Sequence, residues 1–297
     1  MEIIKNFKTD KNALTLPWTE SPFFFDLLES SNLSEEERQM AIDFNKKGYL
    51  IVDLELTDDF VDGVVNDMYD AIKRDSVTLQ AEFYTYSDSP RIFEEWRNSD
   101  NIKNLCLHPK LIKTLEFLYN KEAFPFSTIN FIKGSNQPLH SDVIHFHTMP
   151  QLWMSGVWVA LEDTTTENGT LNIVPGSHKW SVYDYQSLGL PHPDDYENGE
   201  KNNYRIYEDL IINLVETHNV DVKAVPLKKG QALIWAANLL HGGMKIVDEN
   251  STRLTQAIHY FYKDCTRYYH PMFSNIHEGK YAKKWCDEQS NIKTYKK

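Results

Sequence analysis

Residues 154–177 read MSGVWVALEDTTTENGTLNIVPGS, two runs of β-branched and aromatic residues on either side of the turn sequence ENG. Four further runs have the same texture: STINFIK (127–133), VKAVPL (222–227), GQALIWAA (230–237) and RLTQAIHYFYKD (253–264). Several short strands without intervening helices are typical of a β-sandwich or barrel. The sequence therefore predicts a mainly β jelly roll with flanking helices.

Residues 1–126 predict a largely helical lead-in that packs on this barrel. Ser34 and the three glutamates after it have the pattern of a helix N-cap followed by acids in the first turn. Apolar residues recur at helical spacing in 58–75 and again in 101–120. One strand-like run, GYLIVDLEL (48–56), lies between the first two helices.

We expect a single catalytic domain over residues 1–297, with the jelly-roll core at 127–265 and a C-terminal extension at 266–297. A polar, tyrosine-rich segment at 179–221 interrupts the core. Long insertions in compact domains are usually lids or binding loops, so this segment is predicted to be lid-like.

The charge balance excludes several classes of partner. The chain has 43 acidic and 31 basic side chains, and its net charge is −12. Such a protein repels phosphate backbones and anionic lipid, and the lysines form no local stripe. No apolar run approaches the roughly 20 residues that a membrane-spanning helix needs. We expect a small-molecule substrate, with no nucleic acid and no membrane as partner. The oligomeric state is left open.

The cysteines and the N-terminus favour a reducing compartment. Cys106, Cys265 and Cys286 are odd in number and widely spaced, which argues against a disulfide framework and a structural zinc site. The first residues lack the apolar core of a secretory signal. The predicted location is the cytoplasm.

The first candidate for chemistry is His140-Ser141-Asp142. On an extended strand, positions i and i+2 share a face, so this imidazole and this carboxylate converge on one point. The pattern alone is weak, because the composition predicts about 1.6 such pairs by chance. A second pair, His192 and Asp194, has the context of a solvated turn.

His241 is the candidate third ligand, since it ends a hydrophobic strand and precedes two glycines. Two imidazoles and one carboxylate on one face of an octahedron leave three positions open, as in non-haem Fe(II) oxygenases. Arg253, with Thr255 beside it, begins another apolar strand. A guanidinium there is suited to the far end of a dicarboxylate. The alternative is an ordinary surface arginine at a strand start.

Two other interpretations of the histidines are open. His145 and His147 form the H-x-H pair of a cupin-type isomerase or non-oxoglutarate dioxygenase, but position 151 is Gln where such sites usually have glutamate. The pair also has the opposite strand parity to His140 and Asp142. A jelly roll that binds without turnover is the other alternative, and such proteins normally lack one of the ligands or the arginine.

The chain closely resembles the phytanoyl-CoA dioxygenase-like family of Fe(II)/2-oxoglutarate oxygenases in the segment WVALEDTTTENGTLNIVPGSHKW (158–180), with HSD before it and LLHGG and Arg253 after it. The resemblance implies a double-stranded β-helix. It also implies Fe(II) bound by His140, Asp142 and His241, and 2-oxoglutarate paired with Arg253, with O2 as second cosubstrate. Trp158 falls where the family commonly has a tryptophan beside the cosubstrate, although a core aromatic is the alternative.

Further implications concern the reaction. Relatives that halogenate lack the carboxylate of the metal site, so Asp142 favours hydroxylation, with release of succinate and CO2. Two positions depart from the family: many members have glutamine where this chain has Ser141, and serine where it has Gly243. We predict that Asn130, Lys133 and Gln137 take over the missing hydrogen bonds.

Substrate recognition is assigned to two regions, the insertion at 179–221 and the loop at 82–96. That loop offers Tyr84, Tyr86, Arg91 and Trp96, and the insertion offers Arg205. An acyl-CoA needs more local basic charge than the chain has. The predicted substrate is therefore a small metabolite or natural-product intermediate.

Overall fold

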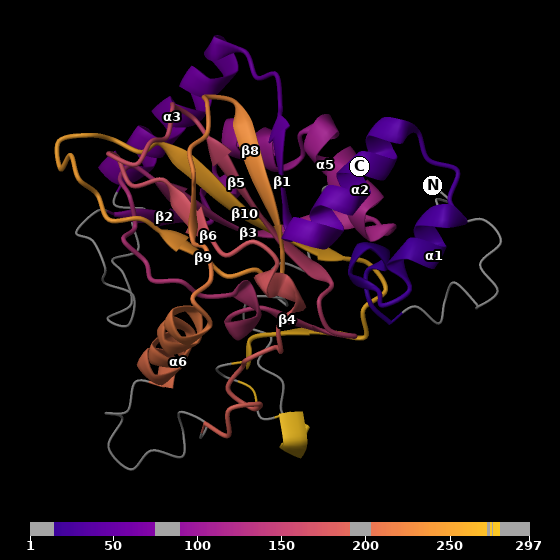
Figure 1. The fold of residues 1–297 in the computed structure, drawn as a ribbon. Coiled ribbons are helices and arrows are strands. Elements are labelled where there is room, and N and C mark those ends of the chain that lie inside the picture. Colours follow the sequence, from indigo (N-terminus) through magenta and orange to yellow (C-terminus); the bar gives the residue numbers. More distant parts are fainter. Residues whose placement is uncertain (1–14, 75–89, 191–202, 272–273, 275, 280–297) are drawn as a thin grey trace.

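The computed structural model describes residues 15–74, 90–190, 203–271, 274 and 276–279. Its centre is a six-stranded antiparallel sheet in the order β1-β8-β5-β10-β3-β2 (Figure 1). These strands are β1 (Tyr49–Asp53), β2 (Arg91–Phe93), β3 (Ala123–Phe131), β5 (Met154–Ala160), β8 (Gln231–Ala236) and β10 (Thr255–Tyr262). A smaller antiparallel sheet, β7-β6-β9, consists of β6 (Leu171–Ile173), β7 (Lys223–Val225) and β9 (His241–Gly243). The predicted jelly-roll architecture with flanking helices is confirmed.

The strands of the large sheet are apolar on both faces, because both faces are covered. On β5, Val157 and Val159 join the core shared with the helices, whereas Trp158 and Ala160 join a second core with the small sheet. Strands buried on both sides read as near-continuous hydrophobic runs. The unbroken run VWVAL in the sequence has this cause.

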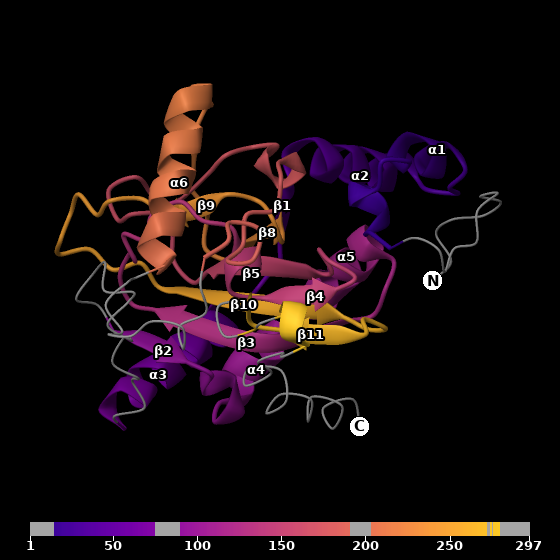
Figure 2. The same cartoon turned by 90° about the horizontal axis from the view of Figure 1, so that it is seen from below.

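The helices form the outer layer. They are α1 (Phe24–Glu29), α2 (Glu35–Lys47), α3 (Asp58–Lys73), α4 (Asp100–Cys106) and α5 (Pro109–Tyr119). Figure 2 shows α3 and α4 on one face of the large sheet, and β9 on the other. Ser34 caps α2 in a complete capping box with Glu37, as its sequence predicts. None of the described helices is long and apolar enough to span a membrane.

The lead-in contributes strands as well as helices. β1 pairs with β8 and β2 pairs with β3, so both edges of the large sheet come from residues before 126. β3 itself begins at Ala123, four residues before the predicted start of the core. Pairing across the sheet decides these boundaries, and local composition does not record it.

The segment PGSHKW (175–180) holds the helical lead-in against the barrel through hydrogen bonds. His178 Nε2 donates to the Asn45 carbonyl at 3.0 Å, and Lys179 Nζ donates to Asn45 Oδ1 at 3.1 Å. Gly48 ends α2 with φ +79°, and any side chain there would overlap the His178 ring. The segment PGSHKW is thus a packing element, and its His178 and Lys179 do not line the cavity described below.

The insertion carries α6 (Asn203–His218). Figure 2 shows α6 on the side of the large sheet opposite α3. Tyr204, Tyr207 and Ile211 form a third core with Ile144 and Leu240. Residues 191–202, with His192, Asp194 and Tyr196, lie outside the described residues.

Two short strands complete the fold: β11 (Arg267–Tyr269), from the C-terminal extension, pairs with β4 (His147–Met149).

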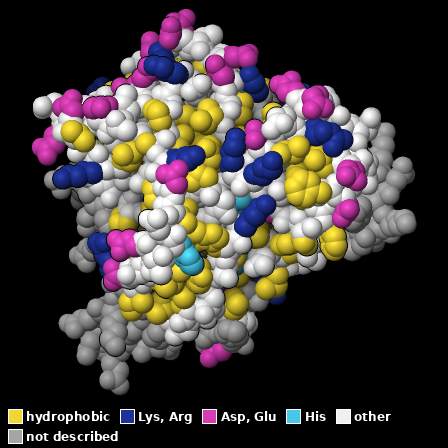
Figure 3. All heavy atoms as spheres, viewed as in Figure 1, with side chains coloured by type: hydrophobic (Ala, Val, Ile, Leu, Met, Phe, Trp, Pro, Cys, Tyr) yellow, Lys and Arg dark blue, Asp and Glu magenta, His cyan; other side chains and the backbone are white. Residues whose placement is uncertain are grey.

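On the face drawn in Figure 3, acidic side chains follow the upper margin and apolar side chains gather toward the middle. Cys106 and Cys265 are free thiols, and Cys286 lies outside the described residues.

Candidate active site

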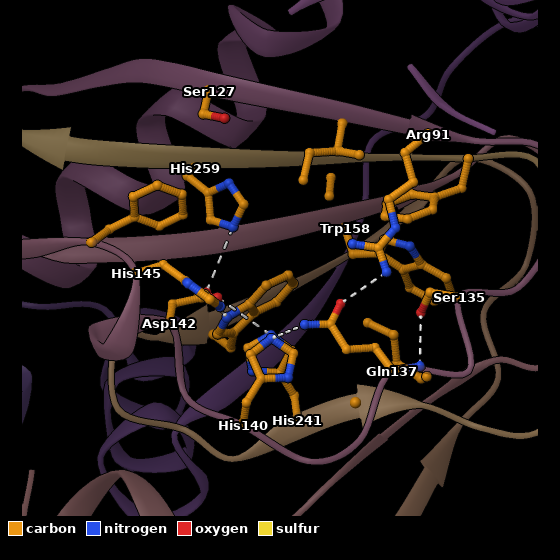
Figure 4. A pocket seen from close by; sticks show the side chains of 18 of the residues that line it. Arg91, Ser127, Ser135, Gln137, His140, Asp142, His145, Trp158, His241 and His259 are labelled. Atoms are coloured by element: carbon orange, nitrogen blue, oxygen red, sulfur yellow. Dashed lines mark hydrogen bonds and ion pairs between the residues drawn. The ribbon is translucent and has the colours of Figure 1, made fainter. Parts of the chain in front are cut away.

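A cavity of about 480 Å³ opens between the large and the small sheet. His140, Asp142 and His241 line it, and Arg253 and Trp158 do so as well (Figure 4). The structure therefore brings together residues that are separated by more than a hundred positions in the chain. Its walls are otherwise mainly apolar, from Phe93, Ile129, Phe131, Phe146 and Leu171.

The three predicted ligands meet at one point. His140 and His241 exchange backbone hydrogen bonds of 2.9 Å in each direction, which holds their side chains next to each other. One donor atom from each of His140, Asp142 and His241 lies within 4.8 Å of the others. All three residues are buried. This spacing fits one metal ion that is bound by all three.

The local backbone differs from the predicted extended strand. His140 forms a single β-bridge, and Asp142 begins a 3₁₀ turn, Asp142–Ile144. Ser141 between them keeps extended angles, with φ −108° and ψ 149°. One extended residue is enough to bring the two side chains to the same side, so the convergence is retained without the strand.

Backbone carbonyls determine which nitrogen each histidine presents. His140 Nδ1 lies 2.9 Å from the Pro138 carbonyl, and His241 Nδ1 lies 3.0 Å from the Leu239 carbonyl. A carbonyl only accepts, so each Nδ1 carries a proton and Nε2 is the nitrogen left to face the cavity. Metal-ligating histidines are typically oriented in this way.

Asp142 is held by hydrogen bonding from the opposite wall. Trp235 Nε1 donates to its Oδ2 at 2.7 Å, and His259 Nε2 lies 3.7 Å from the same oxygen. Burial alone would raise the pKa of Asp142, but the imidazoles of His241 and His259 outweigh burial and hold that pKa well below its usual range. Burial and the neighbouring His241 lower the pKa of His140 to about 3. At neutral pH the site therefore presents a carboxylate and a neutral imidazole.

At the other end of the cavity lies Arg253, which is 1 % exposed. Its guanidinium carbon lies 5.2 Å from the Trp158 ring centre and 5.3 Å from that of Phe131. One amino group donates to the Gly169 carbonyl at 2.8 Å. Burial, and then the nearby Arg91, lower the pKa of Arg253 to about 9, so it stays cationic at neutral pH.

Three buried polar atoms of the residues predicted to bind the cosubstrate have no hydrogen-bond partner among the described residues. They are Nε of Arg253, Oγ1 of Thr255 and Nε1 of Trp158. Arg253 and Trp158 line the cavity, whereas Thr255 does not. No carboxylate of the described chain pairs with Arg253. A buried cation surrounded by unused donors is costly unless a ligand supplies the acceptors.

Asn130, Lys133 and Gln137, which were predicted to supply the missing hydrogen bonds, lie in different places. Gln137 lines the cavity, and its Nε2 lies 3.2 Å from His140 Nε2. Asn130 faces the helical side of β3, where its amide donates to Gln256 at 3.0 Å, and Lys133 donates to the Glu249 carbonyl at 2.9 Å. Neither Asn130 nor Lys133 lines the cavity. Strand alternation turns Asn130 away from it, whereas Lys133 lies beyond the end of β3.

His145 and His147 also separate. The 3₁₀ turn brings His145 into the cavity, whereas His147 lies in β4, 3.5 Å from Asp184 and stacked on Tyr269. The H-x-H pair therefore does not converge on one point, which disfavours the cupin-type interpretation.

Among the candidates for substrate recognition, Arg91 lines the cavity and its NH2 donates to Gln137 Oε1 at 3.3 Å. Trp96 packs in the helical core, and Arg205 pairs with Glu208 on α6 at 3.0 Å. Tyr84 and Tyr86 lie outside the described residues.

Sequence reasoning missed His259 and Tyr207. His259 faces the same side of β10 as Thr255 and Ala257, because alternate residues of a strand share a face. The same alternation, continued from Arg253, would have predicted it. Tyr207 comes from the insertion, and its hydroxyl accepts the Ser141 N–H at 2.8 Å. No local pattern predicts that contact, because only the folded insertion brings the two residues together.

A family model described as phytanoyl-CoA dioxygenase (PhyH) matches residues 44–251. The chain belongs to the phytanoyl-CoA dioxygenase family. The human peroxisomal phytanoyl-CoA dioxygenase is 23 % identical over 207 residues, which cover 65 % of this chain and 56 % of that protein. The chain spans about half the length of the curated phytanoyl-CoA dioxygenases it first matches.

Solved structures support the fold of this family member. EctD from S. alaskensis, solved with 2-oxoglutarate and 5-hydroxyectoine, has a TM-score of 0.58 at 20 % identity and covers 77 % of this chain and 76 % of its own. The carbocyclase SnoK from nogalamycin biosynthesis has a TM-score of 0.58 at 18 % identity and covers 79 % and 86 %. At these identities the likeness concerns the architecture.

Proposed function

We propose that this protein is an Fe(II)/2-oxoglutarate-dependent oxygenase that hydroxylates a C–H bond of a small metabolite or natural-product intermediate. One observation carries the proposal: the His140, Asp142 and His241 cluster shares a single cavity with a buried arginine that has no carboxylate partner among the described residues. The metal site suits the 2-oxo acid end of 2-oxoglutarate, and the buried guanidinium suits the carboxylate at its other end.

Iron fits the donor set. Two imidazole nitrogens and one carboxylate oxygen suit Fe(II) in an open site. His140 and His241 would bind through Nε2, and Asp142 through Oδ1, since Trp235 already donates to Oδ2. Binding at His140 requires the Gln137 amide to turn away from Nε2, which leaves that amide available to a ligand.

2-Oxoglutarate fits the Arg253 end. Arg253 and Trp158 line the cavity, and Arg253 Nε and Trp158 Nε1 are donors without partners among the described residues, while a carboxylate offers several acceptor positions. Charge-assisted hydrogen bonds of this kind are about twice as strong as neutral ones. The ligand would thus neutralise the buried guanidinium while satisfying its neighbours.

When bound, iron and 2-oxoglutarate supply, with O2, the oxidising power that breaks the C–H bond, and succinate and CO2 are released. The protein's own groups bind, orient and exclude water. Phe131 and Phe146 line the cavity, and Tyr207 and Tyr204 of α6 accept hydrogen bonds from Ser141 and Gln137 beside it. A dry, shaped site keeps the oxidation on the substrate.

The cavity size supports a small substrate. About 480 Å³ must hold both the cosubstrate and the substrate, and pockets for small ligands typically span about 300 to 1,000 Å³. Tight binding of CoA thioesters in a calorimetric screen would contradict this part of the proposal.

The reaction itself is tested by anaerobic titration with Fe(II) and 2-oxoglutarate, followed by a succinate-release assay across a metabolite library. We expect a visible charge-transfer band in the wild type and neither band nor turnover in His241→Ala. A wild type without the band would reject the oxygenase and favour a binding protein.

A ring-forming or epimerising oxidation is the second candidate, because SnoK and SnoN share the fold and are described as a carbocyclase and an epimerase. Product mass separates the outcomes. Hydroxylation adds one oxygen, ring closure removes two hydrogens, and epimerisation leaves the mass unchanged.

A further inference from the structure

The loop before His140 contacts the end of β9 closely at Gly243. The φ of Gly243 is not positive, so its backbone conformation is open to other residues. A Cβ at this position, however, would overlap the hydroxyl of Ser135, with the Asn136 nitrogen a further 3.2 Å contact. The glycine therefore makes room for the Ser135 side chain.

Ser135 is placed for binding. It is 5 % exposed and lines the same cavity as Arg253 and Trp158. Its oxygen accepts the Gln137 N–H over a long 3.4 Å, and its own O–H donates to no atom of the described residues. In Figure 4, Ser135 lies at the Trp158 end of the cavity, away from Ser127 and His259. A buried hydroxyl with an unused proton is costly unless a ligand accepts that proton.

We propose that the Ser135 hydroxyl donates to the carboxylate that Arg253 holds, and that Gly243 is the accompanying change that admits it. The inference rests on the proposed function. Many members of the family carry a serine at the position of Gly243. We assign the role of that hydroxyl to Ser135, whose side chain reaches the same place from the opposite side of the cleft. Ser135 is thus a cosubstrate-positioning residue specific to this pattern of sequence.

The competing explanation is that Ser135 only caps its own loop through the Gln137 N–H. A cap affects folding and leaves ligand affinity unchanged. A cosubstrate contact affects the dissociation constant of 2-oxoglutarate and leaves the affinity for the metal alone unchanged. Binding of the two ligands, measured separately, distinguishes the two roles.

The experiment is an anaerobic titration of the Fe(II)-loaded protein with 2-oxoglutarate, followed by the visible charge-transfer band. For Ser135→Ala we expect the dissociation constant to rise about tenfold or more, since a hydrogen bond to a charged group is lost. Fe(II) affinity without cosubstrate should stay at the wild-type value. Ser127→Ala, a buried serine at the far end of the same cavity, is the matched control and should bind 2-oxoglutarate normally.

A positional swap tests the shared point directly. Gly243→Ala should weaken 2-oxoglutarate binding, because the new methyl group displaces the Ser135 hydroxyl. The double variant Ser135→Ala/Gly243→Ser returns a hydroxyl from the other side and should restore most of the affinity lost in Ser135→Ala. The inference is overturned if Ser135→Ala binds 2-oxoglutarate as the wild type does, or if the double variant binds no more tightly than Ser135→Ala. A wild type that shows no band rejects the proposed function instead.

Discussion

The two ends of the cavity differ in how far the protein satisfies the polar atoms of the residues proposed to bind a ligand. At the metal end, His140 and His241 each donate Nδ1 to a backbone carbonyl, and Asp142 accepts from Trp235. At the Arg253 end, Nε of Arg253 and Nε1 of Trp158 have no partner in the described part of the chain.

The difference follows from the ligands that each end suits. A metal ion needs lone pairs that point at one spot, so the protein bonds the opposite side of each ligand and leaves the lone pair free. A carboxylate brings its own acceptors, so the protein leaves donors unused. The candidate metal ligands are therefore oriented by hydrogen bonds before any ligand binds. The donors at the Arg253 end would find their acceptors only when a ligand binds.

The largest effect is expected for Arg253→Met, which removes the unpaired cation. The affinity for 2-oxoglutarate should fall by about 100-fold or more, as for loss of one partner of a buried charge pair. The melting temperature of the ligand-free protein should rise, because an uncompensated buried charge is gone. Titration by the charge-transfer band and thermal unfolding measure the two quantities.

Arg253→Lys is the control for charge without the planar guanidinium, and it should bind 2-oxoglutarate with intermediate affinity. An Arg253→Met protein that melts earlier without ligand would contradict the view that this end is incomplete in the free protein.

Trp235→Phe tests the prebuilt metal end. Losing the 2.7 Å hydrogen bond to Asp142 should lower Fe(II) affinity by about 10- to 100-fold, the range for residues that orient metal ligands. Competition with a chelator of known affinity measures this change. Trp153→Phe is the matched control, since Trp153 is buried outside the cavity and donates to the Thr15 carbonyl. Equal losses in both variants would assign the effect to general packing.

Tyr207→Phe asks whether the insertion belongs to the prebuilt end. The buried Ser141 N–H would lose its acceptor, which costs about 1 to 3 kcal/mol of unfolding free energy. Fe(II) affinity should fall less than in Trp235→Phe. Urea unfolding of the metal-free protein gives the stability. Tyr204→Phe should cost less, because the hydrogen bond that its hydroxyl accepts from the Gln137 side chain is longer, at 3.3 Å. A stability loss without any change in metal affinity would limit Tyr207 to a packing role.

The smallest effect on ligand binding is expected outside the cavity, at His178. Burial lowers the pKa of His178 to about 4, whereas the unfolded chain has a value near 6.5. The unfolded state therefore binds a proton between these values that the native state does not, so stability falls as the pH drops from about 6.5 to about 4, by up to about 3 kcal/mol.

His178→Gln keeps a donor for the Asn45 carbonyl and removes this titration. The wild type should lose about that much more unfolding free energy than the variant as the pH falls from 7 to 4. Denaturant unfolding at a series of pH values measures both proteins. Parallel curves would mean that His178 does not titrate in this range.

Much of the fold is readable from local pattern. The capping box at Ser34, the helical spacing of 58–75 and the apolar runs of β5, β8 and β10 each predict the element that forms there. Of the two edges of the large sheet, β1 lies within the strand-like run GYLIVDLEL. The other edge, β2, was not readable, since it is only three residues long and is a strand because β3 pairs with it.

The site was predictable in part. His140, Asp142, His241 and Arg253 have motif spacing and lie together as expected. Asn130 and Lys133 were expected near them, but strand parity turns Asn130 to the helical face, and Lys133 reaches the Glu249 carbonyl instead. His259 and Tyr207 needed the fold, because their partners lie on other elements.

By itself, the sequence determined the family, the strand-rich core and the residue types able to hold a metal and a dicarboxylate. These depend on periodicity and motif, which are local properties of the chain. Only the tertiary structure decided which polar atoms find partners, that Ser135 occupies the space left by Gly243, and that the insertion reaches the metal loop. Hydrogen bonding and steric fit between distant segments depend on three-dimensional distance, and no linear spacing encodes it.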